Sequence, residues 1–207
     1  MFRAEMPDRL VAGRLQDDLG TAVIGREIIV LEQTASTNDA ILQIANANPK
    51  DGLVVFAEHQ TAGRGQRGNR WESPAGKGLW FSILLRPKLD LASSPRLTAW
   101  AAEAISGAIQ NEFSLTSAIK LPNDVQIDGH KVAGVLVEMR AREKAAHLAI
   151  AGIGVNVNQS REDFPSELQS SAISLAMALG RQVDRHSFAI VLLRNLDRTY
   201  RARFASS

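Results

Sequence analysis

The spacing of apolar residues along the chain predicts which segments are helices and which are strands. Apolar residues repeat at helical spacing in several segments, and in the longest of them Leu97, Ala101 and Ile105 share one face. Ser94-Pro95 stands just before this repeat, where serine caps a helix and proline suits its first turn. The predicted helices are 8–20, a segment that starts at Ser36 or Thr37 and runs through 46, then 94–113, 171–179 and 187–203.

Apolar runs and alternating segments predict the strands. The clearest signal joins two of them: Asp128-Gly129 favours a two-residue hairpin turn, because both residue types tolerate the positive φ that such a turn needs. Strands and helices intermingle without regular βαβ alternation, which favours an α+β fold, a mixed β-sheet with helices packed against it. The predicted strands are 26–32, 52–58, 79–85, 117–121, 124–127, 131–139 and 147–157.

The composition fits one compact domain. The chain has 207 residues, of which 45% are hydrophobic, enough for a full core. No apolar run approaches the roughly 18 residues that indicate a membrane span, and the first eight residues lack the apolar core of a secretion signal. The absence of cysteine excludes disulfides, thiolate catalysis and cysteine metal sites. We expect a cytoplasmic protein.

Charge is distributed unevenly along the chain. The formal net charge is only +2, which is too small to predict nucleic-acid binding by itself. Residues 181–207, however, hold six arginines against two aspartates. This basic segment is either a solvated helix face or a docking surface for an acidic protein partner, and the sequence leaves both open.

A segment rich in glycine and arginine, from Gln60 to Trp71, follows the strand predicted at 52–58. Its closely spaced glycines allow backbone N–H groups to converge on an anion, and its three arginines add charge suited to phosphate. A flexible surface loop is the alternative, and an RNA-binding element fits a nearly neutral chain poorly. Trp71 could staple the loop to the core or stack on a flat ligand such as a purine.

The predicted hairpin places Lys131 just past its turn. Gly134 interrupts the apolar strand that follows, and a glycine inside a strand often marks the close approach of a ligand to the backbone. Asn123 and Asp124 open the preceding strand. This arrangement suggests anion chemistry at Lys131, and the carboxylate of Asp124 could hold Mg²⁺ through oxygen ligands.

Two further segments suit either packing or ligand binding. Ser36-Thr37-Asn38 offers hydroxyls, an amide and backbone N–H groups at a helix start, where a helix cap is the alternative. Gly152 and Gly154 leave one face of a buried strand bare, with Asn156 following on that face, although close packing of a helix would explain them equally. The four histidines show no metal-ligand spacing, and we interpret none as catalytic.

Taken together, these segments resemble the catalytic domain of biotin protein ligases (biotin–acetyl-CoA-carboxylase ligases), in the class II aminoacyl-tRNA synthetase-like superfamily. The resemblance runs from about residue 27 to 200, and the order and spacing of its blocks make it specific. The blocks are Ser36-Thr-Asn, Gln60-Thr-Ala-Gly-Arg-Gly, Trp71 with Ser73-Pro74, Lys120-Leu-Pro-Asn-Asp, Lys131-Val-Ala-Gly and Gly152-Ile-Gly-Val-Asn156.

The resemblance implies a two-step, ATP-dependent ligase. Biotin and ATP would give biotinyl-5′-AMP and pyrophosphate, and the acyl group would pass to one lysine of a biotin carboxyl carrier protein. It also implies catalytic roles for Lys131 and Arg64, and Mg²⁺ binding by Asp124. The implied biotin-binding residues are Ser36, Thr37, Asn38, Gln60, Arg64, Gly65, Gln66, Lys131, Gly134 and Gly152. The implied ATP-binding residues are Arg67, Trp71, Asn123, Asp124, Lys131 and Asn156.

The chain departs from the family pattern in three places. Gln66 stands where arginine is usual, and losing that charge should loosen retention of the adenylate. Leu121 stands where tryptophan is usual before Pro-Asn-Asp, a change in packing. We expect a single catalytic domain over residues 1–207, with neither an N-terminal helix-turn-helix domain nor a C-terminal β-rich domain, and hence no DNA partner.

Two other functions stay open at this point. A lipoate–protein ligase would share the fold and chemistry, but would want a longer glycine run and a more open apolar slot for a linear acyl chain. A biotin- or nucleotide-binding module without turnover is the second alternative. Octanoyl transfer through a cysteine thioester is excluded, because the chain has no cysteine. No membrane partner is expected, and a homodimer is left open.

Overall fold

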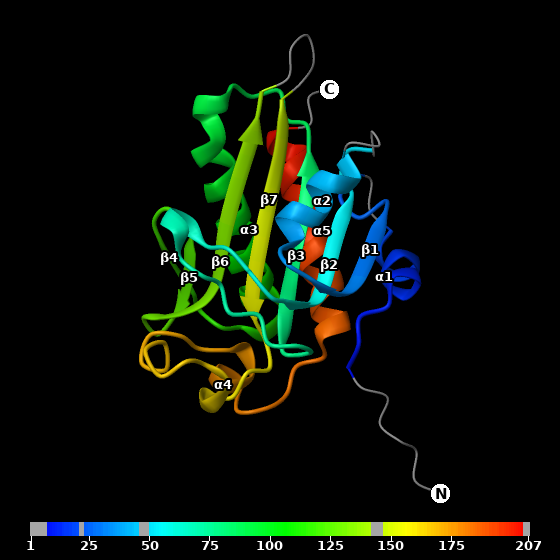
Figure 1. Cartoon of the computed structure of the whole chain (residues 1–207). Coiled ribbons are helices and arrows are strands. Elements are labelled where there is room, and N and C mark those ends of the chain that lie inside the picture. Colours follow the sequence, from blue (N-terminus) through cyan, green and yellow to red (C-terminus); the bar gives the residue numbers. More distant parts are fainter. Residues whose placement is uncertain (1–7, 21–22, 46–49, 142–146, 205–207) are drawn as a thin grey trace, which may run out of the picture.

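The computed structural model describes residues 8–20, 23–45, 50–141 and 147–204 (Figure 1). Within these ranges seven strands form one sheet in the order β1-β2-β3-β7-β6-β5-β4. β1 and β2 are parallel, and the other neighbouring pairs are antiparallel. The mixed sheet with helices packed on it confirms the α+β prediction. The strands are β1 Ile28–Thr34, β2 Val54–Gln60, β3 Gly78–Leu85, β4 Ala118–Lys120, β5 Asp124–Ile127, β6 His130–Arg140 and β7 Leu148–Asn156.

Helices cover the two faces of the sheet unequally (Figure 1). On one face, Phe56 and Phe81 join the larger core with α3 and α5. On the other face, Val55 and Ile150 pack with Ile41 of α2, because neighbouring strand residues point to opposite sides. α2 contacts β2, β3 and β7, so part of this face is left to other segments. The helices are α1 Ala12–Leu19, α2 Thr37–Ala45, α3 Ser94–Phe113, α4 Leu175–Leu179 and α5 Arg185–Arg203.

The predicted elements are present, with some ends displaced. Asp128 and Gly129 have φ values of 49° and 78°, which confirms the hairpin turn. The predicted cap at Ser94 is wrong: this residue lies inside α3, because a 3₁₀ turn leads directly into the helix. The helix expected from residue 8 begins only at Ala12, and the end expected at residue 46 lies outside the described residues.

The helix predicted at 171–179 is shorter than expected, because residues 171–173 form a β-bridge instead of a helical turn. Ser171 and Ile173 pair with the backbone of Lys131 as an added bridge. α4 begins after this bridge, and the Ser174 hydroxyl caps it by accepting a hydrogen bond from the Met177 N–H. None of the helices in the described ranges is long and apolar enough to cross a membrane.

The basic C-terminal segment is used mainly for internal packing. Arg194 donates to the carbonyls of Asp18 and Leu19 at the end of α1, where a cation is favoured by the helix dipole. Arg201 pairs with Asp197, and other arginines of α5 also have partners within the chain. Arg201 and Arg203 are also about half exposed, so part of this segment is a solvated helix face, and a docking surface for an acidic partner stays a prediction.

The first residue of α5 forms a buried ion pair. Arg185 is fully buried, and its Nη1 lies 2.9 Å from Glu58 Oε2 in β2. The same guanidinium donates to the Gly78 carbonyl and bonds Asp8, and Glu58 also accepts from the Leu10 N–H. The interaction therefore ties α5, β2, β3 and the N-terminal segment together.

Replacing Arg185 with alanine should lower the free energy of unfolding by about 3–5 kcal/mol, because Glu58 would be left as an uncompensated buried charge. Arg203→Ala on the same helix is the matched control. Its ion pair with Glu103 is half exposed, so its loss should cost less than about 1 kcal/mol. Urea denaturation of both variants measures the difference, and equal midpoints would contradict the role of the buried pair.

Candidate active site

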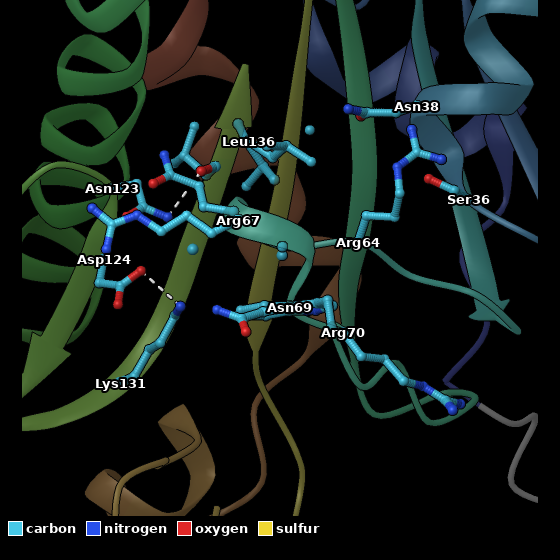
Figure 2. Close-up of a pocket in the computed structure, with 18 of the residues that line it drawn as sticks. Ser36, Asn38, Arg64, Arg67, Asn69, Arg70, Asn123, Asp124, Lys131 and Leu136 are labelled. Atoms are coloured by element: carbon cyan, nitrogen blue, oxygen red, sulfur yellow. Dashed lines mark hydrogen bonds and ion pairs between the residues drawn. The ribbon is translucent and has the colours of Figure 1, made fainter. Parts of the chain in front are cut away.

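A cavity of about 270 Å³ lies on the sheet face that α2 leaves partly uncovered. β6 and β7 form its floor, and the arginine loop (residues 63–71) crosses it (Figure 2). The sequence-predicted residues that line it are Ser36, Thr37, Asn38, Gln60, Arg64, Gly65, Gln66, Arg67, Trp71, Asn123, Asp124, Lys131, Gly134 and Gly152. Lining residues to which the sequence assigned no binding role of their own are Asn69, Arg70, Leu121, Pro122, Val135, Leu136, Ile153 and Gly154.

The floor of the cavity contains a glycine strip formed by Gly134, Gly152 and Gly154. Gly134 and Gly154 are directly opposite each other on β6 and β7. A side chain on Gly152 would overlap with the amide of Asn38, and one on Gly154 would overlap with the ring of Trp71. At Gly134 an added Cβ would lie only 2.9 Å from the Trp71 ring. The strip is bare because these two side chains occupy the space above it.

Buried polar side chains form a continuous hydrogen-bonded chain at the α2 end. Gln60 Nε2 donates to Ser73 Oγ at 2.8 Å, while Gln60 Oε1 accepts from the Thr37 N–H at 2.9 Å. The Ser82 hydroxyl lies 2.8 Å from Thr37 Oγ1 and 2.6 Å from Asn38 Oδ1. Each of these side chains is held by its neighbours before any ligand arrives, which fixes the pattern of donors and acceptors that the site presents.

Trp71 closes the cavity from the loop side. Its ring lies over the glycine strip, packs edge-on against Trp80 with 6.1 Å between ring centroids, and is 5.2 Å from Lys131 Nζ. Its indole nitrogen is buried and has no hydrogen-bond partner among the described residues. Trp71 therefore staples the loop to the sheet, one of the two roles that the sequence allowed, and its stacking on a ligand stays a prediction.

Lys131 extends from the start of β6 into the cavity. Its Nζ lies 2.7 Å from Asp124 Oδ1, and both side chains are partly exposed. Its backbone is fixed on the outer side, because Lys131 N donates to the Ser171 carbonyl and its carbonyl accepts from the Ile173 N–H. The predicted Lys131 and Asp124 thus form one charged pair at the end of the cavity opposite α2 (Figure 2).

Asn156 does not line the cavity. It is buried, its Nδ2 lies 3.3 Å from the Lys131 carbonyl and 3.2 Å from that of Ile173, and its Oδ1 accepts from Gln159. The structure places it behind Lys131, outside the cavity in which it was expected to bind ATP. Its predicted contact with a nucleotide is left as a prediction.

Arg64 and Arg67 reach opposite ends of the cavity. Arg64 donates to Asp39 at 2.5 Å and to Glu138 at 3.2 Å. The hydrogen bond to Asp39 is the main reason that the pKa of Arg64 is raised above its ordinary value. Figure 2 shows Arg64 directed toward α2, whereas Arg67 extends toward Asn123. Among the loop arginines, Arg67 therefore adds positive charge toward the end where Lys131 lies.

Sequence reasoning missed the residues that hold these side chains in place. Ser82 is the polar residue in an otherwise apolar strand, Gly78–Leu85, and Glu138 likewise follows a run of apolar residues in β6. A buried strand carries such a residue at a cost unless a partner is present. A polar residue within an apolar strand was therefore the signal that could have identified Ser82 and Glu138. The sequence could not show which side chains they contact.

The described residues contain no group of three or more histidines, aspartates or glutamates that could hold a metal by themselves. Asp124 offers a single carboxylate beside Lys131. Mg²⁺ is commonly held by one or two carboxylates together with substrate phosphates and water. Asp124 therefore fits a Mg²⁺ ion that arrives with a nucleotide.

The chain belongs to the Biotin/lipoate A/B protein ligase family, which it matches over residues 30–156. It is 38% identical over 195 residues to the bifunctional ligase/repressor BirA of Bacillus subtilis, covering 94% of this chain and 60% of that protein. It is 34% identical over 189 residues to the biotin–[acetyl-CoA-carboxylase] ligase of Mycobacterium tuberculosis, covering 88% of this chain and 68% of the relative.

Solved structures support the same assignment. The biotin protein ligase of Aquifex aeolicus, in complex with biotin and ATP, matches with a TM-score of 0.73 and 30% identity, covering 88% of this chain and 73% of that chain. This match confirms the fold expected from the resemblance. The chain spans about 60% of the length of its Bacillus relatives.

Gly154→Ala should displace Trp71 from the glycine strip, since the added methyl group would overlap with the indole ring. We expect a loss of about 1–3 kcal/mol in stability, as for other overpacked sites, and a change in tryptophan emission. Chemical denaturation followed by fluorescence measures both.

Gly13→Ala is the control for this substitution, because it lies in α1 with open space around the added methyl group. It should be neutral or stabilise the helix by up to about 1 kcal/mol. If Gly154→Ala left both stability and emission unchanged, the steric need for a bare strip would be refuted.

Proposed function

We propose that this chain is the catalytic region of an ATP-dependent biotin–protein ligase, a biotin–[acetyl-CoA-carboxylase] ligase. The observation that carries the proposal is the polarity of the single cavity described above. A buried, hydrogen-bonded polar end at Asn38 and Gln60 is continuous with a cationic end at Lys131 and Arg67. Biotin has a matching polarity, with a cyclic urea at one end and a carboxylate at the other.

The polar end suits the ring of biotin. A cyclic urea has one carbonyl acceptor and two N–H donors, and a dry pocket must supply partners for each. Ser36, Asn38 and Gln60 offer hydroxyl and amide groups that are largely buried. A linear lipoyl or octanoyl chain has no urea groups to pair with the donors and acceptors that remain at this end, which supports biotin over lipoate as the ligand.

The cationic end suits formation of an acyl adenylate. A biotin carboxylate oxygen would attack the α-phosphorus of ATP, forming a P–O bond while the bond to pyrophosphate breaks. This step brings two anions together, and positive charge placed in advance at their meeting point lowers its barrier. Lys131 and Arg67 supply that charge, and Asp124 would hold Mg²⁺, which would neutralise part of the phosphate charge.

The second step needs an amine from outside the chain. A carrier lysine, in its neutral form, would attack the acyl carbon of biotinyl-5′-AMP, forming an amide while AMP leaves and the amine loses a proton. The proposed acceptor is a biotin carboxyl carrier protein, in the cytoplasm. The proposal includes neither DNA nor a membrane as a partner, and it leaves a homodimer open.

The decisive experiment is incubation of the chain with ATP, Mg²⁺, biotin and a carrier domain, followed by mass spectrometry of the carrier. We expect the mass of one biotinyl group to be added to one lysine. Calorimetric titration should show binding of biotin and much weaker binding of lipoate. Binding of biotin without any labelled carrier would favour the module without turnover, and preference for lipoate would favour the other ligase.

Lys131→Ala should leave the fold intact and slow adenylate formation by about 10²–10³, the usual effect of removing one preorganised donor. Pyrophosphate release in a single turnover measures this rate. Lys120→Ala is the matched control, because that lysine is exposed and lies outside the cavity lining. Near-normal pyrophosphate release by Lys131→Ala would refute its catalytic role.

Gln66→Arg tests whether the neutral residue in the arginine loop loosens retention of the adenylate. Gln66 lines the cavity, so an arginine there should add attraction for the phosphate and slow the release of biotinyl-5′-AMP by about tenfold or more. Chase experiments with labelled biotin measure the release. An intermediate that already stays bound for many turnovers in the unsubstituted chain would contradict this expectation.

A further inference from the structure

Glu138 stands where the polar end of the cavity meets the arginine loop. Its Oε2 accepts a hydrogen bond from Asn38 Nδ2 at 2.6 Å and another from Arg64 Nη2 at 3.2 Å. Glu138 does not itself line the cavity, but Asn38 and Arg64 do. One carboxylate thus connects a residue over the sheet to a residue at the start of the loop.

The two bonds differ in environment. Asn38 is 3% exposed and lies against Gly152, where water cannot replace Glu138 as the partner of its amide. The Arg64 side chain is 39% exposed and has a second carboxylate partner, Asp39. Ion pairs exposed to this extent contribute little, whereas a hydrogen bond from a buried amide to a charged group is among the stronger ones. The important partner of Glu138 is therefore Asn38.

A carboxylate can only accept hydrogen bonds, so it decides which way the Asn38 amide faces. Its nitrogen must lie on the Glu138 side, and its oxygen then accepts from the Ser82 hydroxyl at 2.6 Å. The amide nitrogen keeps one further N–H group, which Asn38 can donate to a ligand. A neutral amide in place of Glu138 could donate as well as accept, and both orientations of Asn38 would become available.

We propose that Glu138 is a positioning residue that locks the Asn38 amide in one orientation, so that the polar end of the cavity presents an N–H donor to the urea oxygen of the ligand. This inference rests on the proposed function. It assigns to Glu138 a share in the recognition of the ring and no part in the phosphoryl chemistry at Lys131.

The test is calorimetric titration of biotin, without ATP, into the unsubstituted chain and the Glu138→Gln variant. We expect Glu138→Gln to weaken biotin binding about 10- to 100-fold, the range set by a hydrogen bond to a charged group. The rate of adenylate formation at saturating biotin should change by less than about threefold, because Lys131 is untouched. Unchanged biotin affinity would overturn the proposal.

A biotin analogue with an imino N–H in place of the urea oxygen gives a readout that loss of stability would not move. The locked amide should reject this donor, and the freed amide of Glu138→Gln can turn its oxygen toward it. The dissociation constant of the analogue divided by that of biotin should therefore fall about tenfold in the variant. An unchanged ratio would mean that Glu138 does not orient Asn38.

Asp39→Asn is the matched control, because it removes the other carboxylate on Arg64 and leaves the Glu138–Asn38 bond in place. Biotin affinity should change by less than about threefold, as for an exposed pair. Weakening equal to that of Glu138→Gln would show that the charge balance of Arg64, and not the Asn38 amide, carries the effect, and would overturn the proposal.

Thermal unfolding establishes that each variant is folded. If Glu138→Gln fails to fold, Asn38→Ala removes the amide that Glu138 is proposed to orient and should reduce the same ratio; an unchanged ratio there is equally decisive. If the unsubstituted chain binds no biotin, the proposed function fails together with this inference. If it binds and transfers biotin while the ratio is insensitive to these substitutions, only the role of Glu138 fails.

Discussion

The absence of side chains on the glycine strip is the steric constraint on which the site depends. β6 and β7 meet in register there, and any Cβ would occupy the space of the Asn38 amide or the Trp71 ring. Both side chains come from segments outside the two strands, one from the start of α2 and one from the arginine loop. The bare backbone therefore allows three parts of the chain to meet in one cavity, which suits binding and catalysis in the same place.

Behind this cavity, the polar groups are supported in two layers. Gln60, Thr37 and Ser82 hold one another on the cavity side of the sheet. Two residues before Gln60 in the same strand, Glu58 accepts from the buried Arg185 of α5. β2 thus carries a residue of the site and an anchor to the helix layer almost side by side. Buried polar groups are tolerated here because each has a partner, and those partners also limit movement of the site.

The arginine loop is attached at both ends, which bears on the proposed reaction. Arg64 is held by carboxylates on α2 and β6, and Trp71 packs over the strip. Between them the backbone closes on itself, since Gly65 N donates to the Asn69 carbonyl. A mixed anhydride such as biotinyl-5′-AMP hydrolyses in water, and a loop fixed across the cavity would limit the access of water to it. The ion pairs of Arg64 support the loop, and Arg67 adds positive charge toward the Lys131 end of the cavity. The catalytic role expected of Arg64 stays a prediction.

The sequence by itself determined the elements, the hairpin at Asp128-Gly129 and the membership of most cavity residues, because periodicity, turn chemistry and ordered motifs are local properties. It did not determine which groups pair. Ser82 and Glu138 were connected to the cavity residues only by tertiary contacts, and Asn156 lies behind Lys131, where its amide donates to the carbonyls of Lys131 and Ile173. Pairing between side chains distant in sequence depends on strand order and register, and on these the isolated segments carry almost no information.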